Sequence, residues 1–277
     1  MYRLPIEQYQ SVKDQLLQLP INTLFAQAVV DGHVNGKIYV DNIQLPSTYL
    51  IYHPYGMSLL FGNENNPDFN DAFVKYALNA DNSRIKTEWL QTYPIIWNEK
   101  LSDLFGNNLI KEEAVGEADK YKIELSTRVN FTFNEEKYND FKRNQIETSY
   151  EIVRTEKNHF EAMKGTVVPR YFWNNADDFC QRGVGFSLIY EGKVVSTAFS
   201  AFIVGDKLEL GIESAGEYRG KGFATQTCMA LIDYCLQNNF RPVWACRRQN
   251  INSMLLSHKL GFEPSMSLPF YKLVSEN

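Results

Sequence analysis

The stretch that decides the fold is EYRGKGFAT, residues 217–225. Before it, residues 207–214 (KLELGIES) alternate apolar and polar side chains, which predicts a β-strand with one apolar face. After it, residues 225–239 repeat apolar side chains at helical spacing without Gly or Pro, which predicts a helix. A strand that turns through glycines into a helix directs free backbone N–H groups and the positive helix end at one point. The sequence therefore predicts an anion site over this turn.

The commoner glycine-rich anion loops do not fit this turn. A Walker loop needs four residues between its first Gly and Gly-Lys-Ser/Thr, whereas Gly216 precedes Gly220 at another spacing and no Ser or Thr follows Lys221. A dinucleotide fingerprint needs a third Gly where Thr225 stands. An ordinary glycine turn in front of a core helix is the structural alternative to an anion site.

Two motifs in order carry a family resemblance. Arg219, Gly222 and Ala224 form R-x-x-G-x-A, which resembles the coenzyme A pyrophosphate loop of the GNAT acetyltransferases. Downstream, residues 242–247 predict a short buried strand, and residues 250–262 predict a helix that ends at a Gly. This helix reads N-x-x-S-x-x-x-S-x-x-x-G-F, which is similar to the closing GNAT motif N-x-x-A/S-x-x-x-Y-x-x-x-G-F. The two motifs together indicate the family more strongly than either does alone.

The resemblance implies that the chain uses acetyl-CoA as cosubstrate and passes the acetyl group directly to a primary amine. It also implies that the backbone near the end of the 207–214 strand stabilises the developing oxyanion. The Asn and the small residue of the closing motif would let the chain approach the pantetheine arm. The residues implied in coenzyme A binding are Ile212, Ser214, Arg219, Gly220, Lys221, Gly222, Phe223, Ala224, Thr225, Asn250 and Ser253.

Three side chains are candidates for proton transfer. An ammonium with a pKa near 10.4 has no lone pair, so a carboxylate must take its proton before attack. Glu209 and Glu213 share the face of their strand opposite its apolar side chains, and either could be this base; the alternative is that both are simply exposed strand residues. Ser257 stands where many family members carry a Tyr that protonates the departing thiolate, and its hydroxyl is a much weaker acid. Its structural alternative is packing on a helix face.

The chain is long enough for two domains, since 277 residues exceed the usual size of one. Residues 147–277 predict an α/β (α+β) domain with a GNAT fold, in which helices flank a mixed, mostly antiparallel sheet. A tight hairpin at 191–193 is part of this prediction. The elements expected in it are strand 149–154, a helical region 157–183, strands 185–190, 194–204 and 207–214, and a last strand 268–273.

Residues 1–146 predict a smaller α/β domain, which could be a degenerate GNAT copy. This half has neither the R-x-x-G-x-A loop nor the N-x-x-S helix, so we expect it not to bind coenzyme A. The elements expected in it are helix 6–19, a turn followed by a strand within 31–41, paired strands 49–52 and 57–61, helix 67–80, a helical or irregular stretch through Trp89, Trp97 and Phe105, strand 120–133 and a polar helix or linker at 135–145.

The whole layout resembles the two-part GNAT family that includes zwittermicin A resistance acetyltransferase. The matching segments are 36–41, 183–186, Val195-Ser196 and Trp244-x-Cys246. Each of them is short. Resistance to a particular antibiotic does not follow from a shared fold.

Composition and charge exclude several other classes. A hydrophobic content of 44% and a charged content of 22% are ordinary for a soluble globular protein. No apolar run reaches the length of a membrane span, and the N-terminus lacks the features of a signal peptide, so we expect a cytoplasmic protein. The four Cys form no C-x-x-C pair and the four His show no ligand spacing, so we expect buried reduced thiols and no metal site.

The net charge comes from the first half of the chain. Residues 1–146 hold 14 basic and 19 acidic side chains, whereas residues 147–277 hold 14 of each. No strongly basic patch is present, so we expect no nucleic-acid partner. An acidic half beside a transferase site would favour a cationic acceptor, and a solvated acidic surface is the alternative.

Three functions are consistent with these features. The first is a small-molecule amine N-acetyltransferase, acting for example on an antibiotic or metabolite. The second is a protein or peptide acetyltransferase. The additional domain could narrow the cleft against protein substrates, which would argue against this function. The third is an acetyl-CoA-binding sensor without turnover, which the absence of the Tyr at Ser257 would allow.

Overall fold

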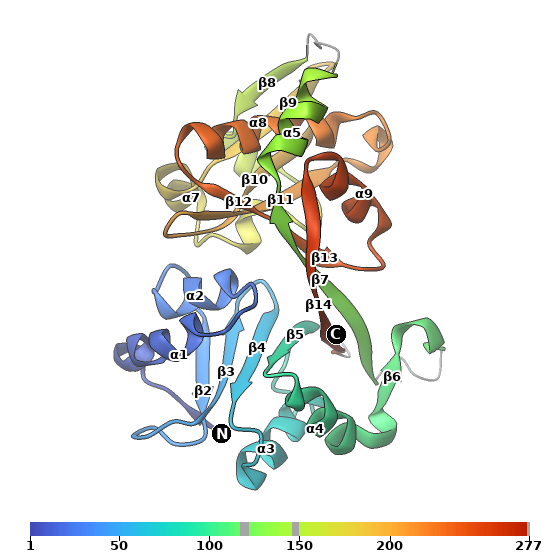
Figure 1. Cartoon of the computed structure of the whole chain (residues 1–277). Coiled ribbons are helices and arrows are strands. Elements are labelled where there is room, and N and C mark those ends of the chain that lie inside the picture. The colour runs from blue at the N-terminus through green and yellow to red at the C-terminus, as the bar shows by residue number, and fades with distance from the viewer. Residues whose placement is uncertain (117–121, 146–149, 276–277) are drawn as a thin grey trace. The chain divides into compact units, whose positions relative to one another are not determined.

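The computed structural model describes residues 1–116, 122–145 and 150–275 and divides into two compact units (Figure 1). Unit 1 comprises Met1–Arg128, Arg247–Gln249 and Ser267–Asn277, and unit 2 comprises Val129–Cys246 and Asn250–Met266. This division differs from the predicted boundary after residue 146. Two long strands, β7 (Ile123–Phe133) and β14 (Phe262–Leu273), each begin in one unit and end in the other. The end of the chain is therefore part of unit 1.

In unit 1 the strands pair in the order β1-β2-β3-β4-β5-β14. The pair β4–β5 is parallel and the others are antiparallel. The strands are β1 (Tyr2–Arg3), β2 (Lys37–Val40), β3 (Thr48–His53), β4 (Met57–Gly62) and β5 (Glu88–Tyr93), and a short β6 (Leu109–Lys111) pairs with the start of β7. The predicted pairing of 49–52 with 57–61 is confirmed.

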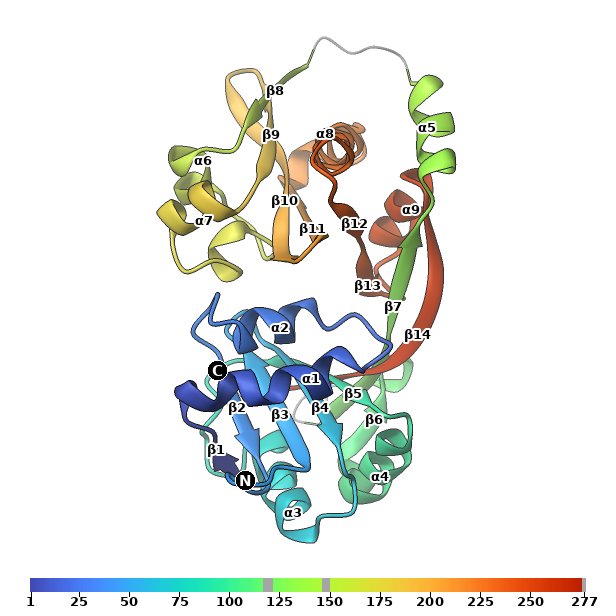
Figure 2. The ribbon, with the colours of Figure 1, turned by 60° about the vertical axis from the view of Figure 1, so that its left-hand side comes forward.

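Helices cover both sides of this sheet. The segments η1 (Ile6–Val12), α1 (Lys13–Leu17) and α2 (Leu24–Val30) lie over the strands on one side (Figure 2). The helices α3 (Pro67–Ala77) and α4 (Ile96–Phe105) pack against Leu50, Leu60 and Leu90. Two short 3-10 helices, η2 (Gly106–Asn108) and η3 (Glu112–Ala114), follow.

Two parts of unit 1 differ from expectation. All seven residues of α2 are buried, so its sequence lacks the polar stripe that reveals an amphipathic helix. Trp89 lies in strand β5, and only Trp97 and Phe105 are helical, so the prediction of one helical or irregular stretch was wrong at Trp89. A strand buried on both faces has no alternation to identify it.

We predict that His53 makes the stability of unit 1 depend on pH. His53 is fully buried, and its Nδ1 accepts a hydrogen bond from the Tyr55 N–H at 3.0 Å. Burial, with a smaller effect of Lys86, lowers the pKa of His53 from 6.5 to about 3. Between these pKa values the unfolded chain binds more protons than the folded chain. The contribution of neutral His53 to the free energy of unfolding is therefore complete above pH 6.5 and is lost as pH falls toward 3. Within this range the free energy of unfolding should fall by up to about 1.4 kcal/mol per pH unit.

The substitution His53→Asn should flatten this acid dependence. The Asn carbonyl can still accept from the N–H two residues on, and Asn does not titrate. Urea unfolding at pH 7 and at about pH 4.5 measures the difference. His258→Gln, at an exposed site in unit 2, is the control. Equal pH dependence of the wild type and His53→Asn would contradict the prediction.

In unit 2 the five-stranded sheet has the order β12-β11-β10-β9-β8. The pair β11–β12 is parallel and the other pairs are antiparallel. Its strands are β8 (Glu151–Arg154), β9 (Gly185–Tyr190), β10 (Lys193–Val204), β11 (Lys207–Ser214) and β12 (Arg241–Val243). The predicted hairpin is confirmed, and it turns through Glu191 and Gly192 at φ 52° and 72°. Residue 149 of the predicted strand 149–154 lies outside the described residues, as do residues 120 and 121 of the predicted strand 120–133.

The remaining elements of unit 2 include the long helix α8 (Phe223–Gln237) and the shorter helices α5 (Glu135–Arg143) and α9 (Ile251–Lys259). The short strand β13 (Ala245–Arg247) lies in unit 2 except for Arg247. The region 157–183 is not one helical stretch. It forms three short helices, α6 (Lys157–Ala162), η5 (Pro169–Tyr171) and α7 (Ala176–Arg182), with irregular chain between them. Gly165 and Pro169 interrupt the helical pattern.

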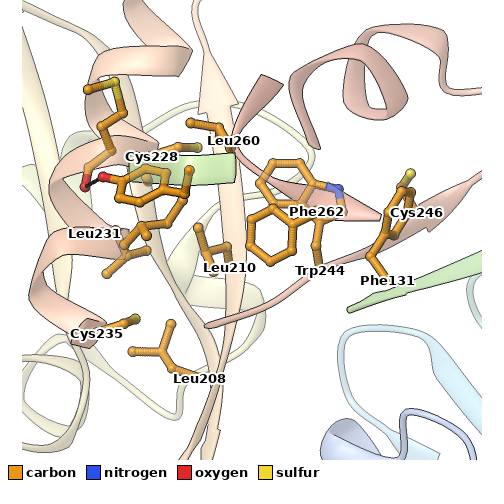
Figure 3. Close-up of a cluster of buried hydrophobic side chains, with 14 of the residues drawn as sticks. Phe131, Leu208, Leu210, Cys228, Leu231, Cys235, Trp244, Cys246, Leu260 and Phe262 are labelled. Carbon is orange, nitrogen blue, oxygen red and sulfur yellow. Dashed lines mark hydrogen bonds between the residues drawn. The ribbon is translucent and has the colours of Figure 1, made fainter. Parts of the chain in front are cut away.

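The core of unit 2 lies between α8 and the sheet (Figure 3). Leu208 and Leu210 of β11 pack against α8, and Trp244 packs against Phe262. Gly261 ends α9 at φ 82°, and a Cβ there would lie 2.7 Å from the Asn134 carbonyl oxygen, so only Gly fits. Three of the Cys are buried as expected, but Cys180 is exposed on α7.

Two features are absent from the described ranges. No helix there is both long and apolar enough to cross a membrane. Within the same residues, no three His, Cys, Asp or Glu side chains gather as a metal site would require.

Candidate active site

Strand β11 loses one of its two neighbours half way along its length. Lys207, Leu208 and Glu209 pair in parallel with residues 241–243 of β12, and β12 ends there. After Trp244 the chain continues as β13, which neighbours β7 instead. Among the strands that the structure describes, residues 210–214 of β11 therefore pair only with β10. The open edge exposes backbone hydrogen-bonding groups next to the glycine loop.

The direction of these backbone groups follows from the pairing with β10. Ser214 lies opposite Ser196, and the next residue, Ala215, donates its N–H to the Val195 carbonyl oxygen at 3.0 Å. The Ser214 carbonyl oxygen accepts from Arg219 Nε at 3.4 Å. In an antiparallel pair, alternate residues direct their N–H and C=O groups to the same side. The Ile212 N–H therefore points to the open side, as the Ser214 carbonyl does. Such a fixed N–H can stabilise an oxyanion.

The loop after β11 forms an open cradle at the start of α8. Gly220 and Gly222 have φ values of 80° and 83°, and Gly222 is the N-cap of α8, without a side-chain cap. The first amides of the helix are therefore left for another acceptor. A Cβ added at Gly216, Gly220 or Gly222 would meet nothing within 4 Å, so the space over the loop is open. These features fit the diphosphate of coenzyme A.

The loop side chains divide into two groups. Phe223 and Thr225 are buried, and Phe223 packs with Leu188 and Val195, so Phe223 can offer a ligand only its backbone. Lys221 places its Nζ over the rings of Tyr218 and Tyr190, at 5.1 and 5.8 Å. This cation–π arrangement keeps the lysine charge beside the loop.

The closing motif contacts Trp244, the residue that follows the end of β12. The Asn250 side chain caps α9 by accepting from the Ser253 N–H at 3.2 Å. The Ser253 hydroxyl accepts in turn from Trp244 Nε1 at 3.2 Å. Ser257 is fully buried and donates its hydroxyl to the Met254 carbonyl at 2.8 Å. The hydroxyl of Ser257 thus serves its own helix.

We predict that Ser257→Ala leaves turnover almost unchanged. The hydrogen bond to Met254 is local, so kcat should stay within about twofold and the free energy of unfolding should change by about 1 kcal/mol or less. Steady-state kinetics and urea unfolding check both values. Ser253→Ala, which removes the acceptor for Trp244, is the matched comparison and should cost more stability. A large fall in kcat at unchanged stability would assign Ser257 a chemical role.

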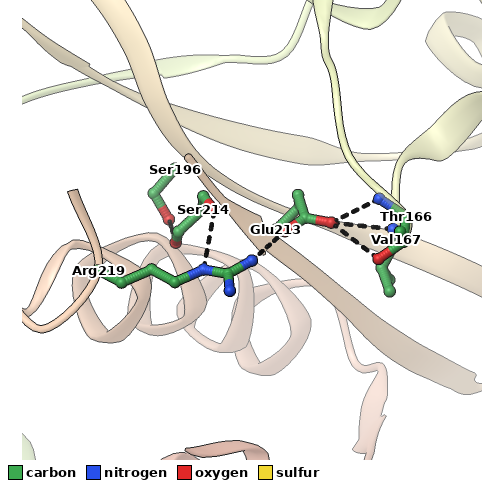
Figure 4. Close-up of polar contacts among 6 residues, drawn as sticks. All are labelled: Thr166, Val167, Ser196, Glu213, Ser214 and Arg219. Atoms are coloured by element: carbon green, nitrogen blue, oxygen red, sulfur yellow. Dashed lines mark hydrogen bonds and ion pairs between the residues drawn. The ribbon is translucent and has the colours of Figure 1, made fainter. Parts of the chain in front are cut away.

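The two glutamates of β11 lie in different surroundings. Glu209 is 5% exposed and stands at the last residue pair shared with β12. Glu213 Oε2 accepts from the N–H groups of Thr166 and Val167 at 2.9 and 3.0 Å (Figure 4). Glu213 Oε1 lies 3.3 Å from the Arg219 guanidinium. The two carboxylates thus share a strand and its face, but their surroundings differ.

The partners of Glu213 were not found from the sequence. Thr166 and Val167 lie in the region expected to be helical, where N–H groups would be used within the helix. Gly165, in the middle of that region, was the available signal of a break.

The chain is similar to known proteins over nearly its whole length. A family model described as GNAT acetyltransferase matches residues 14–271. A curated relative, "Uncharacterized N-acetyltransferase YdfB" of Bacillus subtilis (strain 168), is 24% identical over 250 residues, which is 89% of either chain.

Two solved structures show the same fold over the full length. One is a GCN5-related N-acetyltransferase-like protein from Streptococcus suis 89/1591, with a TM-score of 0.70 at 19% identity, covering 97% of this chain and 99% of the other. The second is a tandem GNAT protein from the clavulanic acid biosynthesis pathway, with a TM-score of 0.59 at 10% identity, covering 100% and 98%. An α/β architecture with two mixed sheets is therefore shared with these structures.

Proposed function

The chain belongs to the GNAT acetyltransferase family, and we propose that it transfers the acetyl group of acetyl-CoA to a primary amine of a small molecule. The observation that supports this most is the parting of β12 from β11 directly beside the open glycine loop. The loop offers amides to a diphosphate, and the strand edge offers amides to a carbonyl oxygen. Both lie in unit 2, which carries the two family motifs.

In the proposed reaction each group of unit 2 has one task. The amides at the start of α8 hold the diphosphate, and the Ile212 N–H receives the carbonyl oxygen of the acetyl group. The Glu209 carboxylate first takes a proton from the acceptor ammonium. The amine nitrogen then bonds to the acetyl carbon, the C–S bond breaks, and the second proton of the nitrogen passes to solvent. A thiol of pKa about 8.5 leaves as a stable anion near neutral pH, so no general acid is needed. Ser257 therefore has no step in this scheme.

The finer identity of the acceptor is part of the proposal. A small amine, such as an antibiotic or metabolite, agrees with the resemblance to the two-part family that includes zwittermicin A resistance acetyltransferase. An acidic first half favours a cationic acceptor. The proposal keeps the expected cytoplasmic location, and the groups named here carry out the transfer without a metal.

Acetyl-CoA-dependent thiol release tests the proposal. The full chain is mixed with acetyl-CoA and with polyamines, aminoglycosides, amino sugars or lysine-containing peptides. Turnover on a small amine is expected. Turnover only on peptides would identify a protein acetyltransferase, and thermal stabilisation by acetyl-CoA without any turnover would identify a sensor. The absence of both stabilisation and turnover would contradict the assignment of the loop.

A further inference from the structure

The irregular segment 163–168 is fastened to the end of β11 by one carboxylate. Glu213 Oε2 accepts from the N–H groups of Thr166 and Val167 at 2.9 and 3.0 Å, and the Thr166 hydroxyl lies 3.5 Å from the same oxygen (Figure 4). Gly165 has φ +145°, and a Cβ there would lie 2.5 Å from this oxygen. The segment can therefore approach Glu213 only because residue 165 is a Gly.

The other oxygen of the same carboxylate faces the cofactor loop. Glu213 Oε1 lies 3.3 Å from Arg219 NH2, while Arg219 Nε donates to the Ser214 carbonyl at 3.4 Å. Arg219 belongs to the R-x-x-G-x-A loop. The Glu213 side chain is 11% exposed, whereas the Arg219 side chain is 65% exposed, so solvent screens the Arg219 contact. One partly buried carboxylate thus bridges the diphosphate loop and the segment 163–168.

These contacts engage both oxygens of Glu213. Oε2 accepts from the N–H groups of Thr166 and Val167, and Oε1 faces Arg219. The same contacts are well suited to hold the segment against the sheet face that carries Glu209.

We infer that Glu213 is a positioning residue that couples the diphosphate loop, through Arg219, to the segment 163–168 on the face where Glu209 takes the proton of the amine. This inference rests on the proposed function. A diphosphate that immobilises the loop restrains Arg219 and hence Glu213, so acetyl-CoA binding makes opening of the segment rarer. Binding of acetyl-CoA thereby holds the segment 163–168 on the face of the sheet where the amine reacts. The cofactor site and the acceptor site are coupled in this way.

Two substitutions separate the parts of this bridge. In Glu213→Ala both contacts are lost. In Glu213→Gln the amide oxygen can still accept from Thr166 and Val167, but the amide NH₂ cannot accept from Arg219. Glu217→Gln removes a charge from an exposed position of the same loop and is the matched control.

Amide hydrogen exchange at Thr166 and Val167 in the full chain tests the inference without turnover. In Glu213→Ala we expect exchange about tenfold faster than in the wild type. Glu213→Gln should keep most of the protection of the free protein. Saturating acetyl-CoA should slow exchange in the wild type and in Glu217→Gln, but not in Glu213→Gln.

Kinetics distinguish positioning from proton transfer. We expect Glu213→Ala to raise KM for the amine more than it lowers kcat, and Glu213→Gln to recover most of this loss. Two results would overturn the inference. One is loss of the acidic limb of the pH–rate profile in both Glu213 variants. The other is amide exchange in the wild type that saturating acetyl-CoA leaves unchanged. A chain that acetyl-CoA does not stabilise thermally would overturn the proposed function, whereas unchanged exchange in Glu213→Ala would overturn only the role of Glu213.

Discussion

Replacing Gly222 with Asp is expected to abolish acetyl-CoA binding. Gly222 is the N-cap of α8, and its position has open space where the diphosphate is proposed to bind. A carboxylate there would face the negative charges of the ligand. Two like charges 4 Å apart repel by about 4 kcal/mol at an effective dielectric constant of 20, which corresponds to roughly a thousandfold weaker binding. Titration calorimetry with acetyl-CoA measures the change directly.

The control for this experiment is Gly222→Asn. Asn has the shape of Asp without its charge, and both tolerate a left-handed backbone better than other side chains do. The two variants should therefore have similar thermal stability, and Asn should retain much of the affinity. Equal, near-wild-type affinity in both would show that the diphosphate binds elsewhere. Equal loss in both would indicate a steric effect and not an electrostatic one.

Replacing Glu209 with Gln is expected to lower kcat by about a hundredfold to ten-thousandfold, the usual contribution of a general base. The amide keeps the shape of the side chain at the end of the β11–β12 pairing but cannot take a proton. Affinity for acetyl-CoA should stay unchanged, because the loop lies beyond the other end of β11. The wild-type rate should fall at low pH as the base is protonated, and the residual rate of Glu209→Gln should not follow that curve.

The comparison with Glu213→Gln makes the assignment specific. Both variants remove one negative charge from the same face of the same strand. Because Glu209 is buried, equal thermal stability of wild type and Glu209→Gln must be established first. A kcat close to that of the wild type in Glu209→Gln, or a larger fall in Glu213→Gln, would exclude Glu209 as the base.

The parts predicted correctly from the sequence depend on neighbours along the chain. Strand 207–214 shows its own alternation, and the hairpin at Glu191 and Gly192 requires backbone angles that few residues adopt. The same holds for the left-handed glycines of the loop and for Gly261 at the end of α9. The two motifs sufficed to predict the family, which the comparisons show.

The parts that needed the structure depend on residues far apart in the sequence. Thr166 and Val167 lie 47 and 46 positions before Glu213, and no local pattern predicts that their N–H groups meet its carboxylate. The difference between Glu209 and Glu213 therefore appears only in the folded chain. The limits of the two units are another example, since the end of β14 pairs with β5, whose sequence lies far upstream.

The sequence by itself thus determined the glycine loop, the strand and helix beside it, and the family, because periodicity and backbone angles act within a few residues. The tertiary structure alone decided where β12 leaves β11, which N–H groups meet the Glu213 carboxylate, and to which unit the last strand belongs. Those outcomes follow from hydrogen bonds and packing between distant segments, which form only when the whole chain folds.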